Sequence, residues 1–188
     1  SLPSGTGDVH IGLFANVTGT VKNLKLTGGS ISYSGSNDFY VGSIAAKASG
    51  TIENCHSTIN ISGKATTYFI DGYAGGIVGD GTDATITNCS NTGTVTIPAH
   101  SNSNYPVSSN YAGGIAGTGS AKTVIEKCFN TGNISSAVEN GFSSGYYDTA
   151  YAAGICHSGK ITDCYNTGAV TASSIKNLDK LYAYGIGG

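Results

Sequence analysis

The sequence predicts an all-β fold: a parallel β-helix (β-solenoid) of about five coils, with three short strands in each coil and a right-handed sense. Three observations support this prediction. Related segments recur along the chain, short runs of β-branched residues fill them, and no window supports a helix of ten or more residues, with a weak helical spacing at Ala172–Tyr182 alone. The right-handed sense follows from the crossover that dominates parallel strand connections.

The repeats comprise five units and the opening of a sixth. The three closest copies read YAGGIVG, YAGGIAG and YAAGICH at their starts. The units start at His10, Tyr40, Tyr73, Tyr111 and Tyr151, with a partial unit from Tyr182. We therefore expect residues 1–188 to form a single β-solenoid domain. The interrupted last copy and the missing initiator Met predict a processed or excised piece of a longer protein.

Each unit holds three runs with strand character, separated by Gly, Asn and Thr. In the third unit they are Tyr73–Ile77, Thr85–Cys89 and Gly93–Thr96. A unit of this size cannot bury an apolar face alone, so each coil must cover its neighbour, with equivalent strands about 4.8 Å apart.

Stacking of this kind places equivalent apolar side chains in columns that form the interior. The first column is Phe14, Ile44, Ile77, Ile115, Ile155 and Ile186. The second is Val21, Ile52, Ile86, Ile125 and Ile161. The third is Ile31, Ile61, Val95, Ile134 and Val170.

Two further columns predict tight backbone geometry. One contains Gly12, Gly42, Gly75 and Gly113, with Ala153 in the fifth unit, and indicates a sharp bend or a close backbone approach. The Asn-Thr-Gly triplets that begin at Asn91, Asn130 and Asn166 predict turns in which Asn and Gly adopt positive φ. We expect the stacked Asn side chains to hydrogen-bond along the axis.

Composition excludes several classes of protein. The net charge is −2 and all nine basic residues are Lys, so the chain lacks the basic patch of a nucleic-acid binder. No apolar run approaches the ~20 residues of a membrane span. The first residues have neither the basic start nor the apolar stretch of a signal peptide.

Four of the five cysteines occupy one column of the repeat. They are Cys55, Cys89, Cys128 and Cys164. The first unit has Leu24 in this column, the spacings fit no zinc motif, and the chain has no CxxC. Cys156 aligns with Ala45. We therefore expect buried free thiols, in preference to disulfides, metal ligands or nucleophiles.

Catalytic chemistry has little support in the sequence. The acidic residues are scattered, and the closest grouping, Asp80 with Asp83 in one loop, has no counterpart in neighbouring units and no basic residue placed nearby. His56 and His157 each follow a Cys, so they should point to the opposite, outer face. We predict no catalytic residues, no metal site and no cofactor.

Tyrosine provides the candidate ligand-binding residues. One column consists of Tyr40, Tyr73, Tyr111, Tyr151 and Tyr182, and the predicted loops add Tyr105, Tyr146 and Tyr147. Facing outward, the column would form an aromatic strip for stacking on sugars or for contact with a protein. Facing inward or sideways, it would be a structural stack.

The units resemble the GLUG repeat of bacterial surface proteins. The resemblance rests on residues 74–79 (AGGIVG), 86–89 (ITNC) and 91–95 (NTGTV), and equivalent residues recur in the units from Tyr111 and Tyr151. It implies an exported, non-enzymatic stalk or adhesin-like module, secreted or at the bacterial cell surface. Its partner would be a host or bacterial surface glycan or protein.

Two other functions stay open: a carbohydrate-binding module, and a carbohydrate-active β-helix enzyme of the lyase or hydrolase type. An uncovered terminal coil would also expose strand edges, so we expect a tendency to associate end to end.

Overall fold

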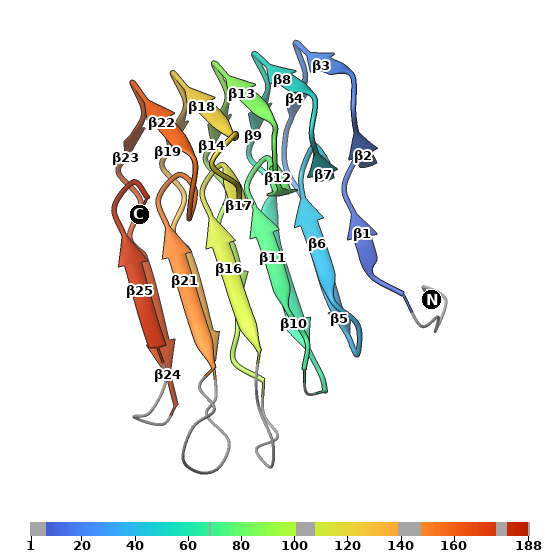
Figure 1. The fold of residues 1–188 in the computed structure, drawn as a ribbon, viewed down its shortest axis with the longest axis vertical. Coiled ribbons are helices and arrows are strands. Elements are labelled where there is room, and N and C mark those ends of the chain that lie inside the picture. Colours follow the sequence, from blue (N-terminus) through green and yellow to red (C-terminus); the bar gives the residue numbers. More distant parts are fainter. Residues whose placement is uncertain (1–6, 68, 101–107, 139–147, 176–179, 188) are drawn as a thin grey trace.

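The chain is described by a computed structural model, which places residues 7–67, 69–100, 108–138, 148–175 and 180–187. These residues form strands and connecting segments only, and every strand pairing among them is parallel (Figure 1). The strands stack in five sheets, which we call sheets A to E in the order in which each coil visits them. The predicted β-solenoid of about five coils is therefore confirmed.

The strands of each sheet come from successive coils. Sheet A contains β1 (Val9–Ile11), β6 (Phe39–Gly42), β11 (Gly72–Gly75), β16 (Ser109–Gly113), β21 (Thr149–Ala153) and β25 (Lys180–Tyr184). Sheet B contains β2 (Phe14–Val17), β7 (Ala45–Ala48), β12 (Val78–Asp80) and β17 (Ala116–Thr118). Sheet C contains β3 (Thr20–Lys22), β8 (Thr51–Glu53), β13 (Thr85–Thr87), β18 (Val124–Glu126) and β22 (Lys160–Thr162).

The last two sheets complete each coil. Sheet D contains β4 (Lys25–Leu26), β9 (His56–Ser57), β14 (Ser90–Asn91), β19 (Phe129–Asn130) and β23 (Tyr165–Asn166). Sheet E contains β5 (Ser30–Gly35), β10 (Asn60–Ala65), β15 (Val95–Ile97), β20 (Ile134–Val138) and β24 (Val170–Ser174). In Figure 1 the chain rises along sheets A and B on the near side and descends through sheets D and E behind, while the coils advance from right to left. This course is right-handed.

The prediction of three strands per coil is wrong, because a full coil has five. The run from Tyr73 to Ile77 gives way to a second strand, β12, beyond a bend at Gly76 and Ile77. A Cβ on Gly75 would meet the carbonyl group of Val78, so the bend requires a residue without one. The two residues of β14 form another short strand, within the segment predicted as a turn.

The register places the unit starts directly beside one another. His10 pairs with Tyr40, Tyr40 with Tyr73, and the pairing continues through Tyr111 and Tyr151 to Tyr182. The second and third predicted interior columns are likewise paired residue by residue. The first column fails at its first member. Phe14 pairs with Ala45 instead of lying beneath Ile44, because the first coil is one residue shorter at this bend.

The interior has two apolar clusters. One lies among sheets B, C and D and contains Ile52, Ile86, Ile125 and the buried cysteines. The other lies between sheets A and E and contains Phe39, Val41 and Ile61. Full burial of each large side chain stabilises the fold by about 1.5–3 kcal/mol. The end coils, which have a neighbour on one side, leave equivalent positions such as Val21 and Val170 half-buried.

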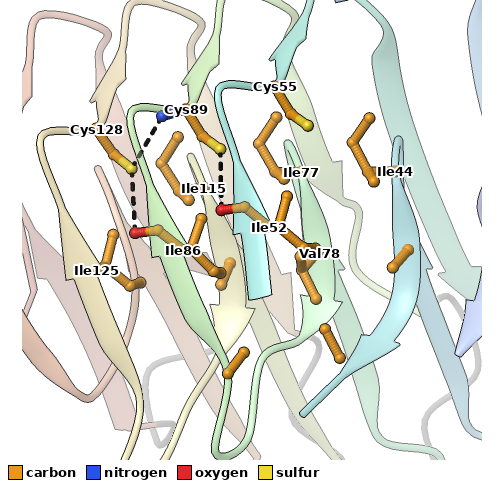
Figure 2. Packing of buried hydrophobic residues seen from close by; sticks show 14 of the residues in the cluster. Ile44, Ile52, Cys55, Ile77, Val78, Ile86, Cys89, Ile115, Ile125 and Cys128 are labelled. Atoms are coloured by element: carbon orange, nitrogen blue, oxygen red, sulfur yellow. Dashed lines mark hydrogen bonds between the residues drawn. The ribbon is translucent and has the colours of Figure 1, made fainter. Parts of the chain in front are cut away.

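The cysteine column lies inside the first cluster, as predicted (Figure 2). Cys55, Cys89 and Cys128 are buried, and Cys164 of the last full coil is half-buried. Each thiol donates toward a carbonyl oxygen two residues earlier, as Cys89 Sγ does to Thr87 at 3.2 Å. The backbone N–H of Cys89 in turn donates to Cys128 Sγ at 3.3 Å. The thiols of the column are thus free and hydrogen-bonded.

Thiol reagents should distinguish these positions. In the folded protein we expect Cys164 to react slowly and the other four cysteines not to react. The side chains of Cys55, Cys89, Cys128 and Cys156 are at most 1% exposed. The neighbouring Cys128 thiol and burial raise the pKa of Cys164, which slows its reaction further. In unfolded, unreduced protein a thiol titration should find all five groups. Fewer than five would reveal a disulfide.

The predicted asparagine ladder is present. Asn91 Nδ2 donates to Asn130 Oδ1 at 2.8 Å, and Asn130 Nδ2 donates to Asn166 Oδ1 at 2.8 Å. Asn91 and Asn130 are fully buried. The turn geometry predicted for this segment is wrong, because neither Asn91 nor Gly93 has positive φ.

Positive φ is found instead at the connection between sheets C and D. This column consists of Asn23, Asn54, Asn88, Lys127 and Asp163, with φ between 50° and 60°. Asn and Asp tolerate this conformation because their short side chains bond locally. Asn54 Nδ2, for example, donates to Asn23 Oδ1 at 2.7 Å.

Candidate functional site

The tyrosine column lies on the outer face of sheet A. Along β11, Tyr73 is half-buried between the buried Gly72 and Ala74, so its side chain points away from the interior. The same alternation holds for Tyr111 and Tyr151. Because the register pairs these positions in successive coils, the side chains form one row along the axis.

The rings of this row, which we call the tyrosine ladder, are stacked face to face. Their centroids are 4.7 Å apart for Tyr40–Tyr73, 5.0 Å for Tyr73–Tyr111, 4.6 Å for Tyr111–Tyr151 and 4.8 Å for Tyr151–Tyr182. The planes of neighbouring rings differ by 8° or less. This spacing matches the ~4.8 Å between adjacent strands, so the backbone sets it.

Stacking covers the ring faces that a sugar would need. The face of Tyr40 at the end of the ladder is taken by Lys47, whose Nζ lies 3.6 Å from the ring centroid, and by the edge of His10 at 5.3 Å. At the other end the ring centroids of Tyr184 and Tyr182 are 6.2 Å apart. The ladder therefore presents ring edges and hydroxyl groups outward, which suits hydrogen bonding better than stacking on a pyranose face.

His157 packs against the ladder. Its ring makes T-shaped contacts with Tyr151 and Tyr111, with ring centroids 4.2 Å and 5.2 Å apart. Its Nδ1 atom is buried and has no hydrogen-bond partner among the residues that the structure describes. Burial lowers the pKa of the imidazole. The expectation that His157 points outward is correct, but the side chain is half-buried beside aromatic rings. His56 differs, since its Nδ1 lies 2.7 Å from Ser90 Oγ.

Acidic side chains accompany the first coils of the ladder. Asp8, Asp38 and Asp71 each directly precede one of the paired residues of β1, β6 and β11. The expectation that acids are merely scattered is therefore wrong on this face. Asp38 Oδ1 accepts the N–H of Asp71 at 2.8 Å, and Asp71 Oδ1 accepts that of Ser109 at 2.7 Å. These carboxylates bind the backbone of the next coil, a structural task.

The carboxylates of Asp80 and Asp83 also make structural contacts. Asp80 Oδ1 accepts the backbone N–H of Thr82 at 2.9 Å. Asp83 lies 3.7 Å from Lys122 of the following coil, which corrects the expectation that no basic residue is nearby. Among the described residues, no three His, Cys, Asp or Glu side chains are grouped as a metal site would require.

Burial and charge alter the titration of the ladder. Burial, with the nearby carboxylates of Asp8 and Asp80, raises the pKa of Tyr40 to about 12. Burial raises the pKa of Tyr73 further, and it raises those of Tyr111 and Tyr151 as well. These four tyrosines therefore resist ionisation.

Stability should fall in alkali as a consequence. Unfolded phenols ionise near pH ~10, whereas the phenols with raised pKa values in the folded chain stay protonated. Above that pH the unfolded state therefore binds fewer protons, and the free energy of unfolding decreases. We expect this loss between about pH 10 and about pH 12, seen as a falling urea midpoint. The variant Tyr73→Phe/Tyr111→Phe should lose less over the same interval. An equal loss would assign the alkaline effect to other groups.

Other aromatic candidates have different outcomes. Tyr105, Tyr146 and Tyr147 lie outside the described residues. A second stack, Phe129 on Tyr165 with centroids 5.1 Å apart, was not predicted. The signal that could have found it is the aromatic residue directly after Cys128 and again after Cys164, since a residue that follows a buried column faces outward.

Comparison with protein families gives a match over part of the chain. A model of the GLUG motif matches residues 71–96, which span β11 to β15 and so correspond to about one coil. No curated protein and no solved structure matches the chain significantly. Within the described residues, no helix is long and apolar enough to cross a membrane.

Proposed function

We propose that this chain, which carries the GLUG motif at residues 71–96, is a non-catalytic repeat module of an exported bacterial surface protein, serving as a stalk or an adhesive surface. The observation that carries the proposal is the match between motif and coil. One motif makes one coil, and the motif's buried Ile, Cys and Asn positions form continuous columns through neighbouring coils. Repetition of such a unit builds length and a repeated outer surface.

The side chains that could support chemistry have structural tasks. The cysteines are hydrogen-bonded in the interior, and the carboxylates of Asp38 and Asp71 accept backbone N–H groups. A glycosidase needs two carboxyl groups that face one substrate, and a lyase of this fold type needs acids that hold calcium. This arrangement favours a non-catalytic role. Release of reducing ends from a neutral or acidic polysaccharide by the purified chain would contradict it.

Surface display can be tested on cells of the organism that carries the chain. Antibodies against the folded chain should label intact cells, and protease treatment of those cells should remove the label. Labelling of lysed cells alone would contradict export. Beads coated with the chain then separate the two roles, because an adhesive surface should hold them on mucin or on epithelial cells, whereas a stalk should not. Beads coated with heat-unfolded chain serve as the control.

Carbohydrate binding through the ladder has weaker support than the sequence suggested, because the ring faces cover one another. A glycan that binds this surface would have to hydrogen-bond to ring edges and hydroxyls. Glycan-array binding that is lost on Tyr73→Ala but kept on Tyr73→Phe would show stacking on the ring and revive that alternative.

End-to-end association is expected from the apolar ends. At the N-terminal end a cavity of about 380 Å³ opens among Ile11, Leu13, Leu26 and Ile31, and Leu13 is 54% exposed. At the other end Ile175 is 63% exposed. Light scattering should show mass rising with concentration, and Leu13→Lys should reduce the rise. The control is Phe69→Lys, which changes an exposed residue away from the ends. A strict monomer at high concentration would contradict this expectation, and so would a control that reduces the rise in mass as much as Leu13→Lys does.

A further inference from the structure

The chain has an unusual set of oxidisable side chains. It contains no Trp and no Met, and it has 12 Tyr. Its thiols are hidden, since Cys55, Cys89, Cys128 and Cys156 are at most 1% exposed. A one-electron oxidant that meets the folded surface therefore finds phenols first, with Cys164 as the one half-buried thiol among the described residues.

The tyrosine ladder groups five of these phenols. Each of these residues is half-buried, so part of each side chain is within reach of solvent. Each lies 4.6–5.0 Å from the next ring, with planes within 8°. Overlap of this kind lets a radical formed on one ring pass to its neighbour. It also holds equivalent ring carbons of successive coils side by side.

We propose that the tyrosine ladder is a site of oxidative cross-linking, at which a peroxidase with hydrogen peroxide joins tyrosines of successive coils as dityrosine. Each of two phenols loses one electron and its hydroxyl proton to give a phenoxyl radical. The two radicals form one carbon–carbon bond between positions ortho to the oxygens. The two displaced ring hydrogens move to the oxygens, so both hydroxyls are restored, and the peroxide is reduced to two molecules of water.

The links would fasten one coil to the next. The register pairs each ladder residue with its counterpart, so a bond between Tyr73 and Tyr111 closes a loop that contains one whole coil. A cross-link of this kind restricts the unfolded chain, as a disulfide does, and raises the unfolding temperature. This inference is independent of the proposed surface function, because it concerns only the chemistry of the folded chain.

The test oxidises the purified folded chain with peroxidase and hydrogen peroxide at low protein concentration. We expect dityrosine fluorescence, a monomeric product, a higher unfolding temperature and cross-linked peptides that join neighbouring ladder residues. The variant Tyr73→Phe/Tyr151→Phe keeps the ring stack but leaves no two neighbouring phenols in the ladder, so these cross-links should be lost. Phe fits such a stack, since Phe129 already lies 5.1 Å from Tyr165 with planes 2° apart.

The matched control removes the same number of phenols elsewhere. Tyr33→Phe/Tyr165→Phe removes one buried and one exposed tyrosine outside the ladder and should leave the yield of ladder cross-links unchanged. Circular dichroism of each variant checks that the fold is retained. The proposal is overturned if cross-links map only outside the ladder, if covalent dimers predominate, or if the control loses as much ladder product as the ladder variant.

Discussion

Replacing Asn130 with Ala should lower the free energy of unfolding by about 3 kcal/mol, because it removes the centre of a buried amide ladder. Asn130 is fully buried between Asn91 and Asn166. Its Nδ2 donates to Gly132 O at 2.7 Å as well as to Asn166 Oδ1 at 2.8 Å, and its Oδ1 accepts from Asn91 Nδ2 at 2.8 Å. Alanine can replace none of these contacts.

The cost comes from the groups left behind. An N–H of Asn91 and the carbonyl of Gly132 would each lose a partner in a space that excludes water. A buried polar group without a partner costs about 1–3 kcal/mol. The cavity left by the amide adds to this cost.

The measurement is urea denaturation, with the midpoint and slope compared between the native chain and Asn130→Ala. Thr131→Ala is the control, since Thr131 is the next residue and is exposed. A surface change of this kind should stay within about 0.5 kcal/mol. Equal effects of the two substitutions on the free energy of unfolding would show that the side-chain amides of the asparagine ladder do not stabilise the fold.

The asparagine and cysteine columns could be predicted because the repeat aligns them. A residue that recurs at one position in successive coils must lie beside its copies, whatever the path of the coil. The occurrence of Leu24 in the cysteine column then indicated an apolar surrounding, and Leu24 packs against the same cluster as Cys55. Column identity is therefore readable from sequence.

The path of the coil was harder to predict. Strands of two residues, such as β14 and β19, carry too few side chains to show a period, so the sequence predicts three strands where a full coil has five. The sequence predicts positive φ at Asn91, whereas the structure has it at Asn88. Both positions hold Asn in that coil, so residue type alone cannot separate them. The sequence does not distinguish an Asn that adopts positive φ from an Asn whose side-chain amide hydrogen-bonds along the axis.

The outer surface was the least predictable part. The tyrosine column was visible, but whether its rings would offer faces or cover one another depends on side-chain rotamers. The row of Asp8, Asp38 and Asp71 was missed because Ser109 and Thr149 take over the position in later coils, which ends the repeat. Outer positions vary more freely since no neighbour constrains their volume.

The second prediction concerns the glycines that face the asparagine ladder. A Cβ on Gly114 would meet the carbonyl oxygen of Gly154 and lie 2.6 Å from Asn130 Cγ, so Gly and Asn fit as a pair. Gly76 stands in the same relation to Asn91. In the second coil the equivalent positions hold Ser43 and Ser57, and Ser43 Oγ donates to Gly76 O at 2.5 Å.

This exchange of Gly and Asn for two Ser predicts strong coupling. Gly114→Ser alone should destabilise the fold by about 3 kcal/mol, because overpacking forces the backbone apart. Asn130→Ser alone should cost about as much as Asn130→Ala, since its short side chain cannot reach Asn91 and Asn166. In the double variant the smaller residue at 130 removes the clash of the new side chain with Asn130 Cγ. The backbone must still shift at Gly154 O, as it does in the second coil, where Ser43 Oγ donates to Gly76 O.

The double variant should therefore be more stable than the sum of the single effects by about 1–3 kcal/mol. Urea denaturation of the four proteins of this cycle gives the coupling energy. The control cycle combines Asn130→Ser with Ile97→Val, which lies in the other apolar cluster, and should be additive within about 0.5 kcal/mol. If the single variants unfold completely, the reverse change, Ser43→Gly/Ser57→Asn, extends the ladder toward the second coil, and it should be better tolerated than Ser57→Asn alone. Additive effects in both cycles would mean that the Gly and Asn positions do not pack as a unit.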